Sequence, residues 1–370
     1  MKTIIFILPS IDSVGGAQKM ARFVIENSID LSNYRVFLIP QQNRAKELAF
    51  TKEIEIIRLN NCVNESESRF KRLIKRLFAT FEIRKIIRKI SPNLIVIFGI
   101  TSSSLLALNG LDYPKVYCER GDPFSYPNYL QKMLKKCLAS YRFIVLQTDN
   151  AKKYFDFIDD SKKIVIPNPC IISRPPIVNG NFDSNILISA GRLVNEKRFD
   201  FIIKIFARLK EKNPMLILNI FGNGEKKDFL QKLIHQYKLE DSVFIRPGTS
   251  NILDEISKAK LFLFASTFEG VPNVIIETCG MGIPCVCTNC SPGGADFLTI
   301  GGTVGGKLVD IDDFDGFLSA CLELLHNKKK YTEYSSTGIE FRDRFSETRI
   351  SKMWRDFIVR NVFFDSKTEI

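Results

Sequence analysis

Histidine and tryptophan are scarce in this chain. Its 370 residues include two histidines and one tryptophan. The histidines, His235 and His326, fall in amphipathic stretches and not at the ends of predicted strands. Ligands of open α/β sheets bind beyond the carboxyl ends of the strands. We therefore expect no histidine catalyst.

Paired CxxC knuckles are also missing, although the chain has nine cysteines. Cys279, Cys285, Cys287 and Cys290 lie close together in the sequence and suggest a metal site. Cys285 and Cys287, however, occupy alternate positions of an apolar strand, which favours structural thiols. An odd cysteine count without a Cys-dense pattern indicates a reducing, cytosolic compartment. Asp310-Ile311-Asp312 has metal-like spacing but precedes a helix, where Asp is a common cap, so we expect no metal and no cofactor.

A bilayer-spanning run is the third absence. The first ten residues have a very short apolar core and continue into strand-like sequence, so we expect no signal peptide. Residues 90–111 carry no charge and are long enough to cross a bilayer. Their Ser, Thr, Asn and Pro side chains suit hydrocarbon poorly. A buried strand at Leu94–Phe98 followed by a helix is the better interpretation.

Apolar sequence is abundant: 45% of the residues are hydrophobic, which indicates a globular protein with large cores. Apolar runs alternate with amphipathic stretches, which is typical of an α/β fold. Among them we expect strands at Glu55–Leu59, Lys115–Cys118 and Ile186–Ala190, and a helix from Thr148 to Phe157. The length favours two domains. A segment rich in Pro, Asn and Gly at residues 167–183 is the predicted linker. It separates a domain at residues 1–168 from a second at 184–345, and a last helix lies within 346–370.

Positive charge is concentrated in the first half of the chain. The net charge is +12, and residues 1–170 hold 27 Lys or Arg against 16 Asp or Glu, a net +11. Residues 69–90 contain nine basic residues and one acid, Glu82, with apolar residues at helical spacing. Such a helix is typical of proteins that bind an anionic membrane surface. A core-packed helix with a solvated basic face is the alternative, and no motif supports nucleic acid as a partner.

Residues 261–297 contain the most informative pattern. The apolar run Leu261–Ala265 predicts a buried strand, Asn273–Met281 a helix, and Cys285–Thr288 a second strand. This strand–loop–helix–strand order places the loop at the carboxyl end of a parallel strand, where we expect a ligand site.

Two carboxylates frame that loop and helix. Glu269 precedes the helix and Glu277 lies in its second turn, so both could face one cleft. The backbone N–H groups of Val271, Asn273 and Val274 would point at the same cleft and form an anion site. The alternative is that both carboxylates are surface acids favoured by the helix dipole.

Other charged or glycine-bearing turns also follow predicted strands. Gly15-Gly16 would form a phosphate or sugar cradle, or a plain tight turn. Arg192 and Lys197 flank a turn that suits a diphosphate, or are solvated surface cations. Glu119–Pro123 is a polar loop at a strand end. Gly222-Asn223-Gly224 lacks the third glycine of a dinucleotide fingerprint.

Together these motifs resemble the retaining glycosyltransferases of family 4, found in bacterial surface-polysaccharide biosynthesis. The resemblance implies the GT-B fold: two Rossmann-like doubly wound α/β domains facing a central cleft, with the last helix crossing back to the first domain. The matching residues span nearly the whole chain in the family's order. They are Gly15-Gly16-Ala17, Glu119-Arg120, Ile166-Pro167-Asn168-Pro169, Gly191-Arg192-Leu193, Glu196-Lys197, Phe221-Gly222-Asn223-Gly224, Glu269-Gly270-Val271-Pro272-Asn273, Glu277 and Gly293-Gly294.

The resemblance also implies roles on the donor side. Glu277 would bind the donor ribose, and Glu269 would hold the donor sugar. Arg192 and Lys197 would neutralise the diphosphate leaving group. Glu269, Arg192 and Lys197 are thus the implied catalytic residues here. The full donor set is Gly15, Gly16, Arg192, Lys197, Gly222, Glu269, Gly270, Val271, Pro272, Asn273 and Glu277.

On the acceptor side the resemblance points to Glu119, Arg120 and Asp122. Many relatives carry a histidine where Glu119-Arg120 falls in this chain. Glu119 is therefore the candidate for the acceptor-side catalytic group.

The expected protein is a cytosolic, metal-independent glycosyltransferase. It would move a hexose or N-acetylhexosamine from a nucleotide sugar, UDP-linked in preference to GDP-linked, to a lipid-linked saccharide in O-antigen or capsule-type assembly. Residues 69–90 would dock it on the inner face of the cell membrane. One alternative is a sugar-nucleotide epimerase of the same shape, which needs no acceptor. The other is a non-enzymatic basic protein that binds lipid or nucleic acid and no nucleotide sugar.

Overall fold

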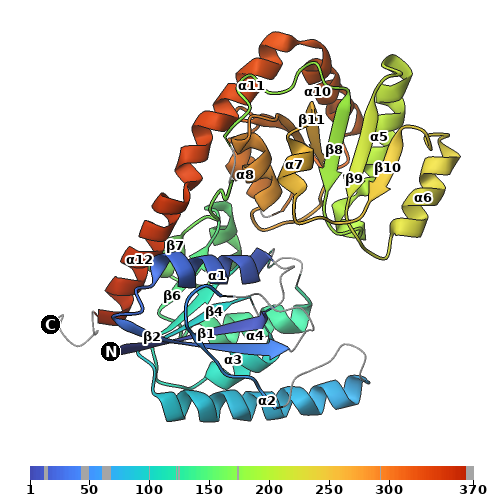
Figure 1. Ribbon diagram of the computed structural model, residues 1–370. Helices are drawn as coiled ribbons and strands as arrows, with labels where there is room; N and C mark the ends of the chain where they lie inside the picture. Colours follow the sequence, from blue (N-terminus) through green and yellow to red (C-terminus); the bar gives the residue numbers. More distant parts are fainter. Residues whose placement is uncertain are drawn as a thin grey trace. The chain divides into compact units, whose positions relative to one another are not determined.

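The chain forms two units, each built on its own parallel β-sheet (Figure 1). Unit 1 is Met1–Asn168 with Thr348–Ile370, and unit 2 is Pro169–Glu347. The computed structural model describes residues 1–11, 16–42, 50–60, 68–99, 101–121, 123, 126–172, 175–291 and 293–363.

Unit 1 has a seven-stranded sheet in the order β3-β2-β1-β4-β5-β6-β7. Its strands are β1 Lys2–Ser10, β2 Tyr34–Gln42, β3 Glu55–Ile56, β4 Leu94–Phe98, β5 Lys115–Cys118, β6 Phe143–Leu146 and β7 Lys163–Val165. Its helices are α1 Gly16–Ser28, α2 Arg69–Ile90, α3 Ser102–Leu108, α4 Asn128–Leu138 and α12 Glu347–Phe363, with 3-10 turns η2 Asn150–Phe155 and η3 Asp160–Lys162.

Unit 2 has a six-stranded sheet in the order β10-β9-β8-β11-β12-β13. Its strands are β8 Ile186–Ala190, β9 Ile217–Phe221, β10 Val243–Arg246, β11 Leu261–Phe264, β12 Cys285–Thr288 and β13 Gly306–Val309. Its helices are α5 Phe199–Lys212, α6 Lys227–Gln236, α7 Ile252–Ile256, α8 Asn273–Gly280, α9 Gly294–Thr299, α10 Phe314–His326 and α11 Lys328–Phe341, with η4 Asn195–Lys197 and η5 Arg342–Phe345.

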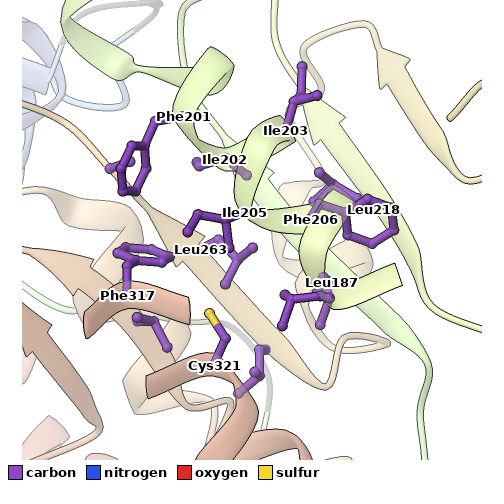
Figure 2. Packing of buried hydrophobic residues seen from close by; sticks show 14 of the residues in the cluster. Leu187, Phe201, Ile202, Ile203, Ile205, Phe206, Leu218, Leu263, Phe317 and Cys321 are labelled. Carbon is purple, nitrogen blue, oxygen red and sulfur yellow. The ribbon is translucent and has the colours of Figure 1, made fainter. Parts of the chain in front are cut away.

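Both sheets are buried on both faces, which is why their strands are continuous apolar runs. In β1, Ile5 and Ile7 belong to one core cluster, while Ile4 and Phe6 belong to the cluster on the other face. In unit 2, α5 covers one face: its side chains pack against β8, β9, β11 and α10 (Figure 2). Each unit therefore has a core on both faces of its sheet, in keeping with the apolar content of the chain.

The last helix, α12, belongs to unit 1. Trp354 is fully buried there, with its ring centroid 5.6 Å from that of Phe98 at the end of β4. Ile350 and Ile358 are buried in the same cluster.

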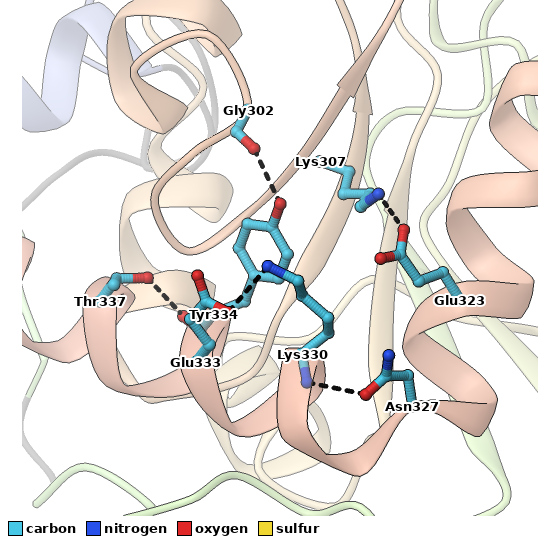
Figure 3. Close-up of polar contacts among 8 residues, drawn as sticks. All are labelled: Gly302, Lys307, Glu323, Asn327, Lys330, Glu333, Tyr334 and Thr337. Atoms are coloured by element: carbon cyan, nitrogen blue, oxygen red, sulfur yellow. Dashed lines mark hydrogen bonds and ion pairs between the residues drawn. The ribbon is translucent and has the colours of Figure 1, made fainter.

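Helices α10 and α11 belong to unit 2 and make polar contacts with it. Lys307 of β13 pairs with Glu323 of α10, and the Tyr334 hydroxyl of α11 donates to the Gly302 carbonyl (Figure 3).

Some predicted elements differ in the structure. The helix expected from Thr148 to Phe157 is the 3-10 turn η2, because the Thr148 side chain accepts a bond from the Ala151 N–H and tight i→i+3 bonds follow. The edge strand β3 has two residues and ends before Leu59. Helices α4, α9 and α11 were not predicted. Within the described ranges, no helix is long and apolar enough to cross a membrane.

Candidate functional site

The loops that follow the strands of unit 2 meet at one edge of its sheet, because all its strands are parallel. Backbone bonds join three of these loops. The Thr267 N–H donates to the Glu196 carbonyl at 2.9 Å, so the loop after β11 is tied to the loop after β8. The Glu269 N–H donates to the Ser291 carbonyl at 2.7 Å, which adds the loop after β12. The side chains of these loops are thus held at one place.

An ion pair between Lys197 and Glu269 lies at this edge. The Lys197 ammonium contacts Oε1 of Glu269, and the two side chains are 17% and 23% exposed. Burial and the nearby positive charge of Arg192 lower the pKa of Lys197 to about 8. The Glu269 carboxylate acts in the opposite sense and stabilises the ammonium form. The pair is therefore two partly desolvated charges that a charged ligand could separate.

The neighbouring cations differ in their exposure. The Arg192 side chain is 69% exposed, with Nη2 3.9 Å from Glu196, so its guanidinium is open to solvent. Arg198 has a left-handed backbone with φ of 50° and pairs with Asp312. A non-glycine residue in this conformation carries strain of roughly 1–3 kcal/mol. The ion pair helps to hold the loop that positions Lys197.

Glycines at this edge allow close packing between the loops. A Cβ on Gly222 would lie 1.9 Å from the Gly191 carbonyl oxygen, and a Cβ on Gly294 would lie 1.9 Å from the Gly270 carbonyl oxygen. The Leu193 N–H also donates to the Asn223 carbonyl at 2.9 Å. Gly222 thus has a packing role that the sequence alone did not assign.

Helix α8 begins at Asn273, directly after Pro272, and carries Glu277 in its second turn. Val271 is buried and joins the core under this helix. The Cys170 thiol donates to the Ile276 carbonyl of α8 at 3.6 Å, so this helix lies against the start of unit 2. Burial and then the negative charge of Glu277 raise the pKa of Cys170 to about 12. Glu277 therefore lies on α8, the helix that follows the loop of Glu269.

Glu119 follows β5 of unit 1, and its carboxylate has several internal hydrogen-bond partners, while its predicted catalytic role stays a prediction. It is 2% exposed. Its Oε2 accepts from the Tyr117 hydroxyl at 2.5 Å. Its Oε1 accepts from the N–H groups of Arg120 and Gly121 at 2.8 and 2.9 Å and from the Tyr126 hydroxyl at 2.8 Å. A carboxylate with four donors is occupied in organising its own loop.

Arg120 also has internal contacts, and its predicted acceptor-side role stays a prediction. Its guanidinium carbon lies 5.3 Å from the Phe98 ring centroid and 5.4 Å from that of Trp354. Nη1 donates to the Ile166 carbonyl and to Oδ1 of Asn168, both at 3.3 Å. Burial lowers the pKa of Arg120. The side chain therefore joins the end of β5 to α12 and to the last residue before unit 2.

Gly15, Gly16 and Asp122 are the remaining residues of the predicted site. Gly15 and Asp122 lie outside the described residues, and Gly16 begins α1. The eight described cysteines are buried and form no disulfide with one another, and the Cys279 and Cys285 sulfurs lie 3.4 Å apart. In the part of the chain that the structure describes, no group of three His, Cys, Asp or Glu side chains could hold a metal ion.

The cage around Glu119 generates a stability prediction. We expect Glu119→Gln to lower the free energy of unfolding by about 2 kcal/mol. The amide N–H₂ of glutamine would face hydroxyl and N–H groups that now donate to a carboxylate oxygen, so some of these hydrogen bonds would be lost. Urea denaturation followed by circular dichroism measures it. Glu53→Gln, on an exposed residue of the same unit, is the control. Unchanged stability combined with lost turnover would instead support a catalytic Glu119.

Comparison with known proteins adds to this geometry. Residues 176–341, most of unit 2, match the family model described as "Glycosyl transferases group 1". The chain is 25% identical over 363 residues to an uncharacterized glycosyltransferase of Haemophilus influenzae, covering 97% of this chain and 100% of that protein. It is 30% identical over 166 residues to the N-acetylgalactosamine-N,N'-diacetylbacillosaminyl-diphospho-undecaprenol 4-alpha-N-acetylgalactosaminyltransferase of Campylobacter jejuni, covering 45% and 44% of the two chains.

Two solved structures share the fold over nearly the whole chain. The apo form of the lipopolysaccharide outer core galactosyltransferase WaaB has a TM-score of 0.76 at 18% identity and covers 96% of this chain and 99% of its own. Anabaena Alr3699/HepE in complex with UDP has a TM-score of 0.77 at 15% identity, with coverage of 97% and 100%. The predicted fold of two Rossmann-like domains is confirmed. The match of residues 176–341 to the glycosyl transferases group 1 model and the similar proteins together support a glycosyltransferase, and the solved structures show its fold.

Proposed function

We propose that the protein is a retaining transferase that moves a hexose or N-acetylhexosamine from a UDP-sugar to a lipid-linked saccharide in surface-polysaccharide assembly. The observation that carries the proposal is the partly buried Lys197–Glu269 pair beside the exposed Arg192. These charges lie at the carboxyl edge of the unit 2 sheet, where α/β sheets bind nucleotides.

The two charges suit the two ends of a sugar-diphosphate bond. Sugar transfer passes through an oxocarbenium-like state while negative charge builds on the leaving diphosphate. Lys197 and Arg192 would stabilise that charge, as fixed cations do in a site that excludes water. Glu269 would accept hydrogen bonds from the sugar hydroxyls. Donor binding would thus exchange the internal ion pair for two contacts with the donor.

Glu277 and the start of α8 complete the proposed donor site. Glu277 would accept from the ribose hydroxyls, and the first N–H groups of α8 would face the sugar-phosphate end. This set supplies charge stabilisation through protein groups alone, so we propose a metal-independent reaction.

The proposals of a lipid-linked acceptor and of UDP as the nucleotide are based on similar proteins. One is named for a diphospho-undecaprenol substrate and another was solved with UDP. The helix α2 adds an observation from this chain: its last turn contains Arg88 and Lys89, and its one acid, Glu82, bonds to Asn60. We therefore propose a cytoplasmic enzyme that is held by charge at the anionic inner face of the cell membrane.

The site assignment predicts that Arg192→Ala and Glu277→Ala each lower turnover without unfolding the protein. We expect a roughly 100-fold loss for Arg192→Ala, the usual size for removing one group that stabilises transition-state charge, and a loss for Glu277→Ala because the donor ribose loses its acceptor. Initial rates with radiolabelled UDP-sugars and an acceptor extracted with membrane lipid measure the effect. Arg208→Ala, an exposed arginine on α5, is the matched control. Wild-type turnover in a folded Arg192 or Glu277 variant would contradict the assignment.

The lowered pKa of Lys197 predicts a pH dependence of UDP affinity. The ammonium is lost as pH rises through about 8, so its attraction for the diphosphate is present below that pH and fades above it. Affinity should fall by at most about tenfold per pH unit, as for the loss of one proton. Calorimetric titration between about pH 7 and 9 measures it. Lys197→Arg, which keeps its charge, should remove the fall; an equal fall in that variant would exclude Lys197 as its source.

A further inference from the structure

The N-terminal half of α2 exposes an unusual amount of apolar surface. Six large side chains are exposed there, although most large apolar residues of unit 1 are in the two cores. Figure 1 shows the same end of α2 extending past the strands of unit 1. The residues are Phe70 at 71%, Leu73 at 55%, Ile74 at 36%, Leu77 at 49%, Phe78 at 55% and Phe81 at 69% exposed.

These six residues form one continuous stripe. Their spacing from Phe70 to Phe81 is i, i+3, i+4, i+7, i+8 and i+11, which spans an arc of about 140° at 100° per residue and a length of about 16 Å. The residues that pack against unit 1, Ala79, Ile83 and Ile87, lie on roughly the opposite side of the helix. The helix therefore has two apolar faces, and the sheet covers only the inner one.

The charges beside the stripe favour one occupant. Lys71 and Lys75 lie along one edge of the stripe, whereas Arg72 and Arg76 lie on the side of Ala79, and no acid precedes Glu82 in the helix. A second copy of this chain would bring the same cations against them and be repelled. An anionic lipid bilayer offers both an apolar interior and negative phosphates at its boundary, which matches an apolar stripe edged with cations.

We propose that the stripe Phe70–Phe81 inserts into the boundary between headgroups and acyl chains of an anionic bilayer. The flanking cations would then lie at the level of the lipid phosphates. This inference rests on the proposed association with the membrane and deepens it. Charge attraction alone disappears in salt, whereas apolar burial persists. The enzyme would thus stay on the membrane while it meets acceptors that diffuse in the same leaflet.

The test is vesicle sedimentation with the full chain. Vesicles of phosphatidylcholine with about one third phosphatidylglycerol are compared with pure phosphatidylcholine at about 0.1 and 0.5 M salt, since the higher salt shortens the range of charge attraction to a few ångströms. The variants are Phe78→Ser/Phe81→Ser for the stripe and Lys71→Gln/Lys75→Gln for the charge. Phe229→Ser, an exposed phenylalanine on α6 of unit 2, is the matched control.

We expect the wild type to keep part of its binding at high salt. Phe78→Ser/Phe81→Ser should lose at least roughly tenfold in partition at both salts, as two unburied aromatic side chains imply. Lys71→Gln/Lys75→Gln should lose binding only at low salt, and Phe229→Ser should match the wild type. As a direct reporter, Phe78→Trp should gain quenching by brominated lipid, while the buried Trp354 is not quenched.

Three results would overturn the proposal. They are complete release of the wild type by salt, wild-type partition of Phe78→Ser/Phe81→Ser, or a lipid-free dimer that this variant converts to a monomer. Calorimetric titration of each variant with UDP keeps the two proposals apart. A stripe variant that partitions differently but binds UDP as the wild type does would bear only on the membrane proposal. A wild type that does not bind UDP would bear only on the proposed donor site.

Discussion

Burial of both faces of each parallel sheet is the constraint from which the site follows. Strands such as Leu94–Phe98 and Leu261–Phe264 have no face open to water, so helices must cover both sides. Polar and charged side chains are then left to the loops at the strand ends. In unit 2 the loops after β8, β11 and β12 are bonded to one another. The charges that the proposed chemistry needs therefore converge on one edge of the sheet.

Charged residues at the two sheet edges have different environments. Glu119 of unit 1 accepts hydrogen bonds from two hydroxyls and two backbone N–H groups. Glu269 of unit 2 faces a single ammonium, and both side chains keep some contact with solvent. The first carboxylate stabilises a loop, and the second can exchange its partner for a ligand. The number of internal partners, more than burial or charge alone, separates a structural carboxylate from a candidate for catalysis.

The sequence predicted what depends on local pattern and missed what depends on distant partners. The bounds of α2, β4, β5, β8 and β12 follow from apolar periodicity and match the structure. The internal roles of Glu119 and Arg120 could not be predicted, because Tyr126 and Trp354 reach them only in the fold. The apolar stripe of α2 was visible as helical spacing, but only its exposure shows that part of it faces away from the core. Helix α11 was missed because its Ser-Ser-Thr-Gly segment has low helix propensity.

The edge of unit 2 with Lys197 and Glu269 is the site where we propose that a nucleotide sugar binds. The most direct test is thermal denaturation of the purified chain with UDP, GDP and their common sugar conjugates, with and without EDTA. A ligand that binds only the folded chain raises the melting temperature by mass action, equivalent to about 2.7 kcal/mol at a hundredfold excess over Kd. We expect a rise with UDP and its conjugates that EDTA does not change. No rise with any nucleotide would contradict it.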